Sequence, residues 1–136
     1  MKKTLMLILC TAAALSVQAG TIRQDNLTLK AGRTSWSKQN GTYTTAAHGK
    51  KFIFIEVEIS NKRSSNVYVN PLRFDLIDRD GNVYSGTISD RDGLDCVELR
   101  TGTKAKGRLA FEVPYNATAK ELLFEISYNE EIRLRL

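Results

Sequence analysis

The sequence predicts an all-β sandwich of about seven strands, and three observations support this fold class. Apolar and polar residues alternate at period two in several segments, most clearly in Lys51–Ser60 and Gly107–Pro114. Turn residues such as those of Asp78–Gly81 separate these segments. No stretch shows the convincing 3.6-residue apolar period of an amphipathic helix. We therefore expect short strands whose apolar faces close on one another, as in a sandwich of the immunoglobulin type.

The first part of the domain predicts two strands around one long polar segment. Ile22–Lys30 is a plausible first strand. Arg33–Gly49 is the least hydrophobic stretch, and it predicts a long loop, or a loop with a short strand at Trp36. Lys51–Ser60 is the strongest strand, and its uncharged face should point inward: Ile53, Ile55, Val57 and Ile59.

The middle of the chain predicts a short strand, a hairpin and a polar connection. Val67–Val69 begins a strand, and Pro71 is expected at an edge or a bulge because proline cannot donate to a ladder. Phe74–Tyr84 predicts a strand, a tight turn and a returning strand. Ser85–Asp95 is a polar connection. One inward face is expected to hold Leu72, Phe74 and Leu76.

The last part of the chain predicts four more strands. Cys96–Leu99 is short and is followed by a turn at Gly102. The inward faces of the remaining three strands follow from their alternation: Leu109, Phe111 and Val113, then Leu122, Phe124 and Ile126, then Ile132, Leu134 and Leu136.

Residues 1–19 have the pattern of a cleaved export signal. Lys2 and Lys3 form a basic start, and Leu5–Val17 is apolar apart from Thr11. Small residues stand at the −3 and −1 positions of a cleavage site after Ala19. We expect residues 20–136 to be one periplasmic or secreted domain without a transmembrane anchor after cleavage.

The two cysteines limit covalent chemistry. Cys10 lies inside the leader, and the bulky Leu9 before it argues against a lipid attachment site. Cys96 is then the one cysteine of the mature chain, so an internal disulfide is not expected. Cys96 alternates out of phase with Val97 and Leu99; we favour an inert, buried thiol over one that pairs with a second chain.

The charge pattern does not indicate nucleic-acid binding. The formal net charge is +5, and Lys2 and Lys3 of the leader contribute two of these charges. The remaining basic residues are scattered among Asp and Glu, whereas nucleic-acid binding needs a clustered basic face.

Three segments of the chain combine into a recognisable order and spacing. They are Gly49–Val57 leading to Asn61, Phe74-x-Leu76-x-Asp78-x-Asp80-Gly81-x-x-Tyr84, and Gly102-x-x-x-x-Gly107-x-Leu109-x-Phe111-x-Val113-Pro114 with Glu121-Leu122 beyond. Together they resemble a family of uncharacterised bacterial extracytoplasmic domains with a telokin-like, immunoglobulin-type fold. The resemblance covers roughly Leu27 to Tyr128, and Thr101 departs from it where the family commonly has proline. It implies a sandwich with an extracytoplasmic role in binding or assembly, and it carries no shared catalytic residues.

No catalytic, cofactor or metal set is expected from the sequence. His48 is the single histidine and has no orienting partner nearby in the chain. Asp-Arg-Asp-Gly occurs twice, but its glycine stands at position 4, whereas a calcium loop needs it at position 6. We interpret both copies as turns. Three aspartates remain as candidate calcium ligands: Asp90, Asp92 and Asp95.

Four aromatic residues are candidates for contact with a partner. Phe52 and Phe54 occupy the second face of the strongest strand, where they mark a binding surface or lie buried under the long loop or a neighbouring strand. Burial is the favoured alternative. Trp36 and Tyr43 lie in the polar segment; Trp36 is a recognition anchor or a cap on one end of the sandwich.

The sequence therefore predicts a non-enzymatic periplasmic or secreted module that binds a protein partner in the cell envelope. An inhibitor or immunity-type protein acting through Arg33–Gly49 is the alternative. A calcium or small-ligand carrier, resting on the aspartates, is more remote.

Overall fold

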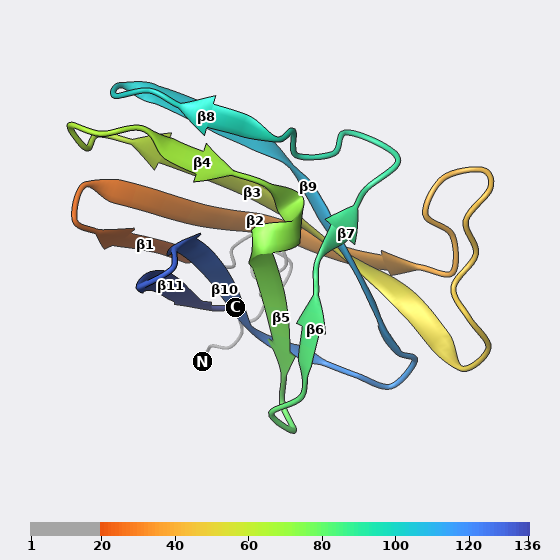
Figure 1. The fold of residues 1–136 in the computed structure, drawn as a ribbon. Helices are drawn as coiled ribbons and strands as arrows, with labels where there is room; N and C mark the ends of the chain where they lie inside the picture. Colours follow the sequence, from red (N-terminus) through yellow and green to blue (C-terminus); the bar gives the residue numbers. More distant parts are fainter. Residues whose placement is uncertain (1–19) are drawn as a thin grey trace, which may run out of the picture.

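The computed structural model describes residues 20–136, which form eleven antiparallel strands in two packed sheets and a small ribbon (Figure 1). One sheet has the order β1-β2-β3-β9-β7: Gly20–Gln24, Leu27–Ser37, Lys50–Asn61, Thr103–Pro114 and Thr87–Ile88. The other has the order β11-β10-β5-β6: Glu130–Arg135, Ala119–Ser127, Phe74–Asp78 and Val83–Ser85. The ribbon pairs β4 (Val67–Val69) with β8 (Val97–Leu99). The predicted all-β sandwich is confirmed, with eleven strands where about seven were expected.

The core lies between the two sheets, on the faces that the alternation predicts. The inward residues of β3 are at most 4% exposed. Phe74 and Phe124, directly paired across β5 and β10, stack with ring centroids 4.4 Å apart and planes inclined by 8°. Burial of one large apolar side chain contributes roughly 1.5–3 kcal/mol. Burial of these side chains between the sheets is therefore a main source of stability.

The turn after β5 is organised by Asp78, which is 3% exposed. Its carboxylate accepts hydrogen bonds from the N–H groups of Asp80 and Asn82 (both 2.9 Å) and from the Tyr84 hydroxyl (3.0 Å). Burial alone would raise the pKa of Asp78, but these hydrogen bonds outweigh burial and hold the pKa below its ordinary value. The first Asp-Arg-Asp-Gly copy is thus a turn, as predicted, with Gly81 at a φ of +87°.

The segment between β4 and β5 differs from the prediction. Pro71 is buried at the start of a 3₁₀ turn, η1 (Pro71–Arg73), and not at a strand edge or bulge. The Asn70 side chain caps this turn by accepting a hydrogen bond from the Leu72 N–H at 2.9 Å. Leu72 therefore leaves the strand alternation and is 60% exposed, which corrects its predicted place beside Phe74.

Two further segments hold more strands than expected, because short turns divide them. The predicted first strand is split into β1 and β2 by Asp25 and Asn26, both with positive φ. The predicted connection Ser85–Asp95 contains β7, since the chain crosses from one sheet to the other at Gly86. A Cβ at Gly86 would lie 2.5 Å from the Pro71 carbonyl oxygen, so the crossing needs glycine.

The predicted export signal at residues 1–19 lies outside the described residues. Within residues 20–136, no helix has the length and apolar character needed to cross a membrane.

Candidate functional site

The polar segment after β2 folds into a hairpin that projects from one end of the sandwich (Figure 1, gold loop). Strand β2 continues to Ser37, so the predicted loop Arg33–Gly49 begins later than expected, at residue 38. Its two arms are joined by one bridge and two backbone hydrogen bonds: Gln39 with Thr45, the Asn40 N–H to the Thr44 carbonyl (2.8 Å), and the Ala46 N–H to the Lys38 carbonyl (2.7 Å). We call residues 38–46 the β2–β3 hairpin.

The hairpin is tied to the edge of the sheet by Asn40, which is 6% exposed. Its side-chain Nδ2 donates to the Ile88 carbonyl at 2.9 Å, and its Oδ1 accepts from the Asp90 N–H at 2.9 Å. Gly41 follows with a φ of +84° and leaves no room for a Cβ beside the Asp90 side chain. These contacts fix the hairpin against β7.

Replacing Asn40 with alanine should loosen the hairpin without unfolding the sandwich. The change leaves the Ile88 carbonyl and the Asp90 N–H without their partner, a loss of about 1–2 kcal/mol. Hydrogen exchange followed by mass spectrometry should show faster exchange in residues 38–46 and unchanged protection in β3. Asn116→Ala, at an exposed asparagine after β9, is the control and should change neither. Equal hairpin protection in Asn40→Ala and the wild type would contradict the anchoring role.

Phe52 and Phe54 lie beneath the hairpin and are 3% and 4% exposed. They form a small cluster with Ala46 of the hairpin and Ala110 of β9, on the outer face of the five-stranded sheet. The Arg108 guanidinium lies 4.2 Å from the ring centroid of Phe54 and covers it. The favoured alternative, burial, is confirmed. Because these rings are covered, they support the hairpin from below and expose little surface of their own.

A cluster of two aromatic rings and one cation lies at the same end of the sandwich. Trp36 and Tyr115 meet edge to face with centroids 5.4 Å apart, and the Lys51 ammonium lies 5.4 and 5.3 Å from the two centroids. Each such cation–aromatic contact contributes roughly 0.5–1 kcal/mol at an exposed site. Trp36 remains 53% exposed and Tyr115 51%. Trp36 is thus packed on one side and open on the other. Lys51 and Tyr115 were not predicted from the sequence, because Lys51 in β3 and Tyr115 after β9 are far apart in the chain.

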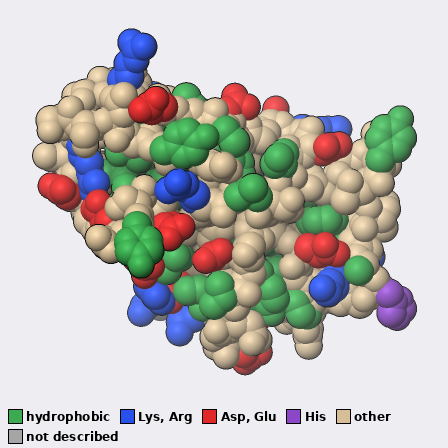
Figure 2. Space-filling model, in the orientation of Figure 1, with side chains coloured by type: hydrophobic (Ala, Val, Ile, Leu, Met, Phe, Trp, Pro, Cys, Tyr) green, Lys and Arg blue, Asp and Glu red, His purple; other side chains and the backbone are tan. Residues whose placement is uncertain are grey.

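Tyr43, between the two arms of the hairpin, is 95% exposed. Figure 2, in the orientation of Figure 1, shows a hydrophobic side chain projecting from the end where the hairpin lies. Acidic and basic side chains are intermingled over the face shown, without a region of one sign. This end therefore offers aromatic surface on an anchored support, the kind of surface that dominates binding energy in protein interfaces.

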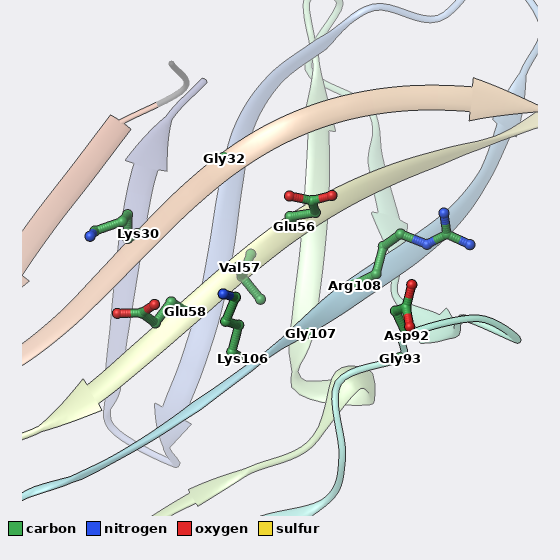
Figure 3. A pocket seen from close by; sticks show the side chains of 10 residues that line it. All are labelled: Lys30, Gly32, Glu56, Val57, Glu58, Asp92, Gly93, Lys106, Gly107 and Arg108. Atoms are coloured by element: carbon green, nitrogen blue, oxygen red, sulfur yellow. The ribbon is translucent and has the colours of Figure 1, made fainter. Parts of the chain in front are cut away.

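A shallow groove of about 580 Å³ lies on the outer face of the five-stranded sheet (Figure 3). Gly32 and Gly107 leave its floor without side chains. Acidic and basic residues alternate across the strands in neighbouring rows, Lys30 with Glu58 and Lys106, then Glu56 with Arg108. Asp92 also lines the groove, so three acidic and three basic side chains offset one another and the net charge favours a ligand of neither sign.

The other candidate residues predicted from the sequence do not come together in one site. His48 is exposed in the turn before β3. Cys96 is exposed, so its predicted burial is wrong; as predicted, it points away from the face of Leu99, which is buried. Within the described range 20–136, no three His, Cys, Asp or Glu side chains converge as a metal site would require, and three aspartates lie along an exposed loop: Asp90, Asp92 and Asp95.

Comparisons with known proteins agree with the fold. Residues 19–132 match the profile of a family described as Domain of unknown function (DUF4352). A candidate lipoprotein from Bacillus subtilis, ycdA, is similar with a TM-score of 0.71 at 16% identity, over 85% of this chain; the chain spans only 38% of that structure. The yjhA protein of Bacillus subtilis has a TM-score of 0.64 at 16% identity, with 88% and 98% of the two chains covered. The secreted protein MPT63 of Mycobacterium tuberculosis has a TM-score of 0.59 at 12% identity, with 88% and 92% covered. No curated protein matches the chain.

Proposed function

The chain belongs to the DUF4352 family, and we propose that it is an exported, non-enzymatic module that binds a protein partner in the cell envelope through its hairpin end. The observation that carries this proposal is the set of exposed aromatic side chains held on anchored backbone: Trp36, Tyr43 and Tyr115. Aromatic residues are enriched among those that dominate interface energy. A surface that is already ordered loses less entropy when it binds, which favours affinity.

Export is part of the same proposal. It rests on the basic start, the apolar run and the small residues before position 20. One of the structural neighbours is a secreted protein and another is a candidate lipoprotein, which is consistent with export. The telokin-like form of the immunoglobulin fold also belongs to the proposal.

A second candidate is an inhibitor or immunity-type protein. Tyr43 stands on a narrow hairpin and is 95% exposed, a shape that suits insertion into a concave site such as an enzyme cleft. The two candidates use the same surface and differ in the nature of the partner.

Replacing Tyr43 or Trp36 with alanine should reduce capture of the partner about tenfold or more, because truncating a dominant aromatic residue removes at least about 2 kcal/mol of binding energy. The purified, tagged protein is crosslinked to the native cell envelope, and the captured proteins are quantified. Val83→Ala is the control, since Val83 is an apolar side chain that is 60% exposed but lies in β6, on the four-stranded sheet and outside the hairpin end. It should capture as much partner as the wild type.

The outcomes separate the alternatives. A single stoichiometric enzyme in the captured fraction favours the inhibitor, and an envelope complex favours assembly. Equal capture by Tyr43→Ala, Trp36→Ala and the wild type would remove the hairpin end as the site. Turnover of generic esterase, peptidase or glycosidase substrates that His48→Ala abolishes would overturn the non-enzymatic assignment.

A further inference from the structure

A recess of about 500 Å³ lies at the opposite end of the sandwich, between β4 and the turn that joins β10 to β11. Two exposed tyrosines line it, Tyr68 at 48% and Tyr128 at 94% exposed. Val67 and Ile126 lie beneath it and are only 3% and 7% exposed, so the apolar surface that it offers is mainly that of the two tyrosine rings. Ser65, Asn66 and Ser127 add polar groups to its lining. The recess shares no residue with the hairpin end and is therefore independent of the function proposed above.

Two arginines line this recess, and their environments differ. The Arg63 guanidinium donates to both carboxylate oxygens of Glu130 at 2.8 and 2.6 Å and to the Asp25 carbonyl at 2.7 Å. Its charge and most of its N–H groups are thus satisfied. Arg73 donates one long hydrogen bond, to the Ile126 carbonyl at 3.4 Å, and has no ion pair within residues 20–136. Arg73 is therefore the cation that remains available in the recess.

Arg73 is also held in place before any ligand arrives. Its N–H donates to the Asn70 carbonyl at 2.9 Å within the η1 turn. Its guanidinium carbon lies 5.4 Å from the ring centroid of Tyr68. The planar guanidinium fork matches the two oxygens of a carboxylate and binds them in a bidentate manner. A half-buried, fixed arginine of this kind needs little reorganisation to accept a carboxylate.

We propose that this recess binds the C-terminal carboxylate of a peptide. Arg73 holds the carboxylate, and Tyr68 and Tyr128 flank an apolar or aromatic side chain of the last residue. Charge supports this choice. Because Glu130 neutralises Arg63, Arg73 is the one uncompensated cation of the recess, and it matches the single negative charge of a carboxylate. The exposed rings of Tyr68 and Tyr128 supply contact surface for an apolar or aromatic side chain, and aromatic residues of this kind dominate the binding energy of contacts with proteins and peptides.

The test is a titration of the purified protein, followed by ¹⁵N NMR, with N-acetyl-phenylalanine and with its C-terminal amide. The acid should shift the signals of Tyr68, Arg73 and Tyr128 and bind about tenfold or more tightly than the amide, since the amide cannot form the charged bidentate contact. Arg73→Gln should remove this difference. Arg79→Gln changes the charge equally in the exposed turn after β5 and should retain it.

Further variants test the roles of the guanidinium and of the recess. Arg73→Lys keeps the charge without the planar fork and should bind the acid more weakly than the wild type. Tyr43→Ala should leave acid binding unchanged, which separates this site from the hairpin end. Equal affinity for acid and amide, or no shift with either at millimolar concentration, would overturn the proposal. Tighter binding of glucuronate than of N-acetyl-phenylalanine at the same signals would show that an acidic sugar, not a peptide end, is the ligand.

Discussion

Arg63→Ala is expected to lower the free energy of unfolding by about 3 kcal/mol. Arg63 is 12% exposed at its side chain and connects three segments that are distant in sequence. It donates to the Asp25 and Gln24 carbonyls of the turn between β1 and β2, and to the Glu130 carboxylate at the start of β11. Alanine removes all of these contacts and leaves Glu130, itself 30% exposed, without its cation. Losing one member of such a pair is costly because the remaining charge stays partly desolvated.

Urea denaturation of the wild type and of two variants measures this effect. Arg133→Ala is the control, since Arg133 is 51% exposed and pairs with Glu121 at 3.2 Å on the outer face of β10 and β11. An exposed pair of that kind is worth at most about 1 kcal/mol. Similar losses in the free energy of unfolding for Arg63→Ala and Arg133→Ala would show that the burial of Arg63 does not strengthen its contribution to stability.

The same ion pair should give a pH signature. The hydrogen bond from Arg63, together with that from Gln24, outweighs burial and lowers the pKa of Glu130 from its ordinary value of 4.5. A carboxyl with a lowered pKa stabilises the fold above that ordinary value, and this stabilisation is lost as pH falls through the lowered pKa. The wild type should therefore lose stability below about pH 4.5, and Arg63→Ala should lose less over the same interval.

Two other carboxyls bear on this profile and are common to both proteins. The lowered pKa of Asp78 adds a loss of the same sign in acid. Asp75 acts in the opposite direction, because burial and the nearby Glu125 raise its pKa and protonation then favours the folded state. The comparison between variants isolates Glu130, and parallel pH profiles of unfolding would contradict the assignment.

Gly107→Ala is expected to destabilise the protein by about 2–3 kcal/mol, which corresponds to a fall in melting temperature of about 10 °C. A Cβ at this position would lie 2.5 Å from the Leu94 Cα and 2.6 Å from the Leu94 nitrogen. These are backbone atoms held against β9 by the hydrogen bond from the Leu94 N–H to the Arg108 carbonyl. The backbone cannot move aside without breaking that contact.

Gly32 in the same groove provides a matched control. A Cβ there would meet nothing closer than 3.9 Å, so Gly32→Ala should leave the melting temperature unchanged or raise it slightly. Thermal unfolding followed by circular dichroism distinguishes the two variants. Equal melting temperatures for Gly107→Ala and Gly32→Ala would show that the approach of Leu94 is looser than described.

Local sequence patterns were sufficient to predict which faces of the long strands are buried and that a turn lies at Asp78. Alternation along β3, β9 and β10 predicts their buried residues, because successive side chains of a strand point to opposite faces whatever its neighbours are. The same rule misplaced Leu72, where capping by Asn70 turns the chain out of the strand. It also missed β7, since two residues carry too little pattern to be seen.

Less of the candidate sites could be predicted from the sequence. Trp36 and Tyr43 were identified as aromatic residues in a polar segment, and both are exposed at one end of the fold. Phe52 and Phe54 are also aromatic, but they are covered by Ala46 of the hairpin, and no local sequence pattern predicts this contact. Burial depends on what crosses over a side chain, and that is a property of the assembled sheets.

By itself the sequence determined the all-β class, the inward faces and the Asp78 turn, because each depends on neighbours within a few residues. Only the tertiary structure decided that Lys51 lies between Trp36 and Tyr115, and that Glu130 satisfies Arg63 while Arg73 stays available. These contacts join residues whose separation along the chain carries no signal. The physical reason is that the packing of the two sheets, and not local preference, sets which charges and rings meet.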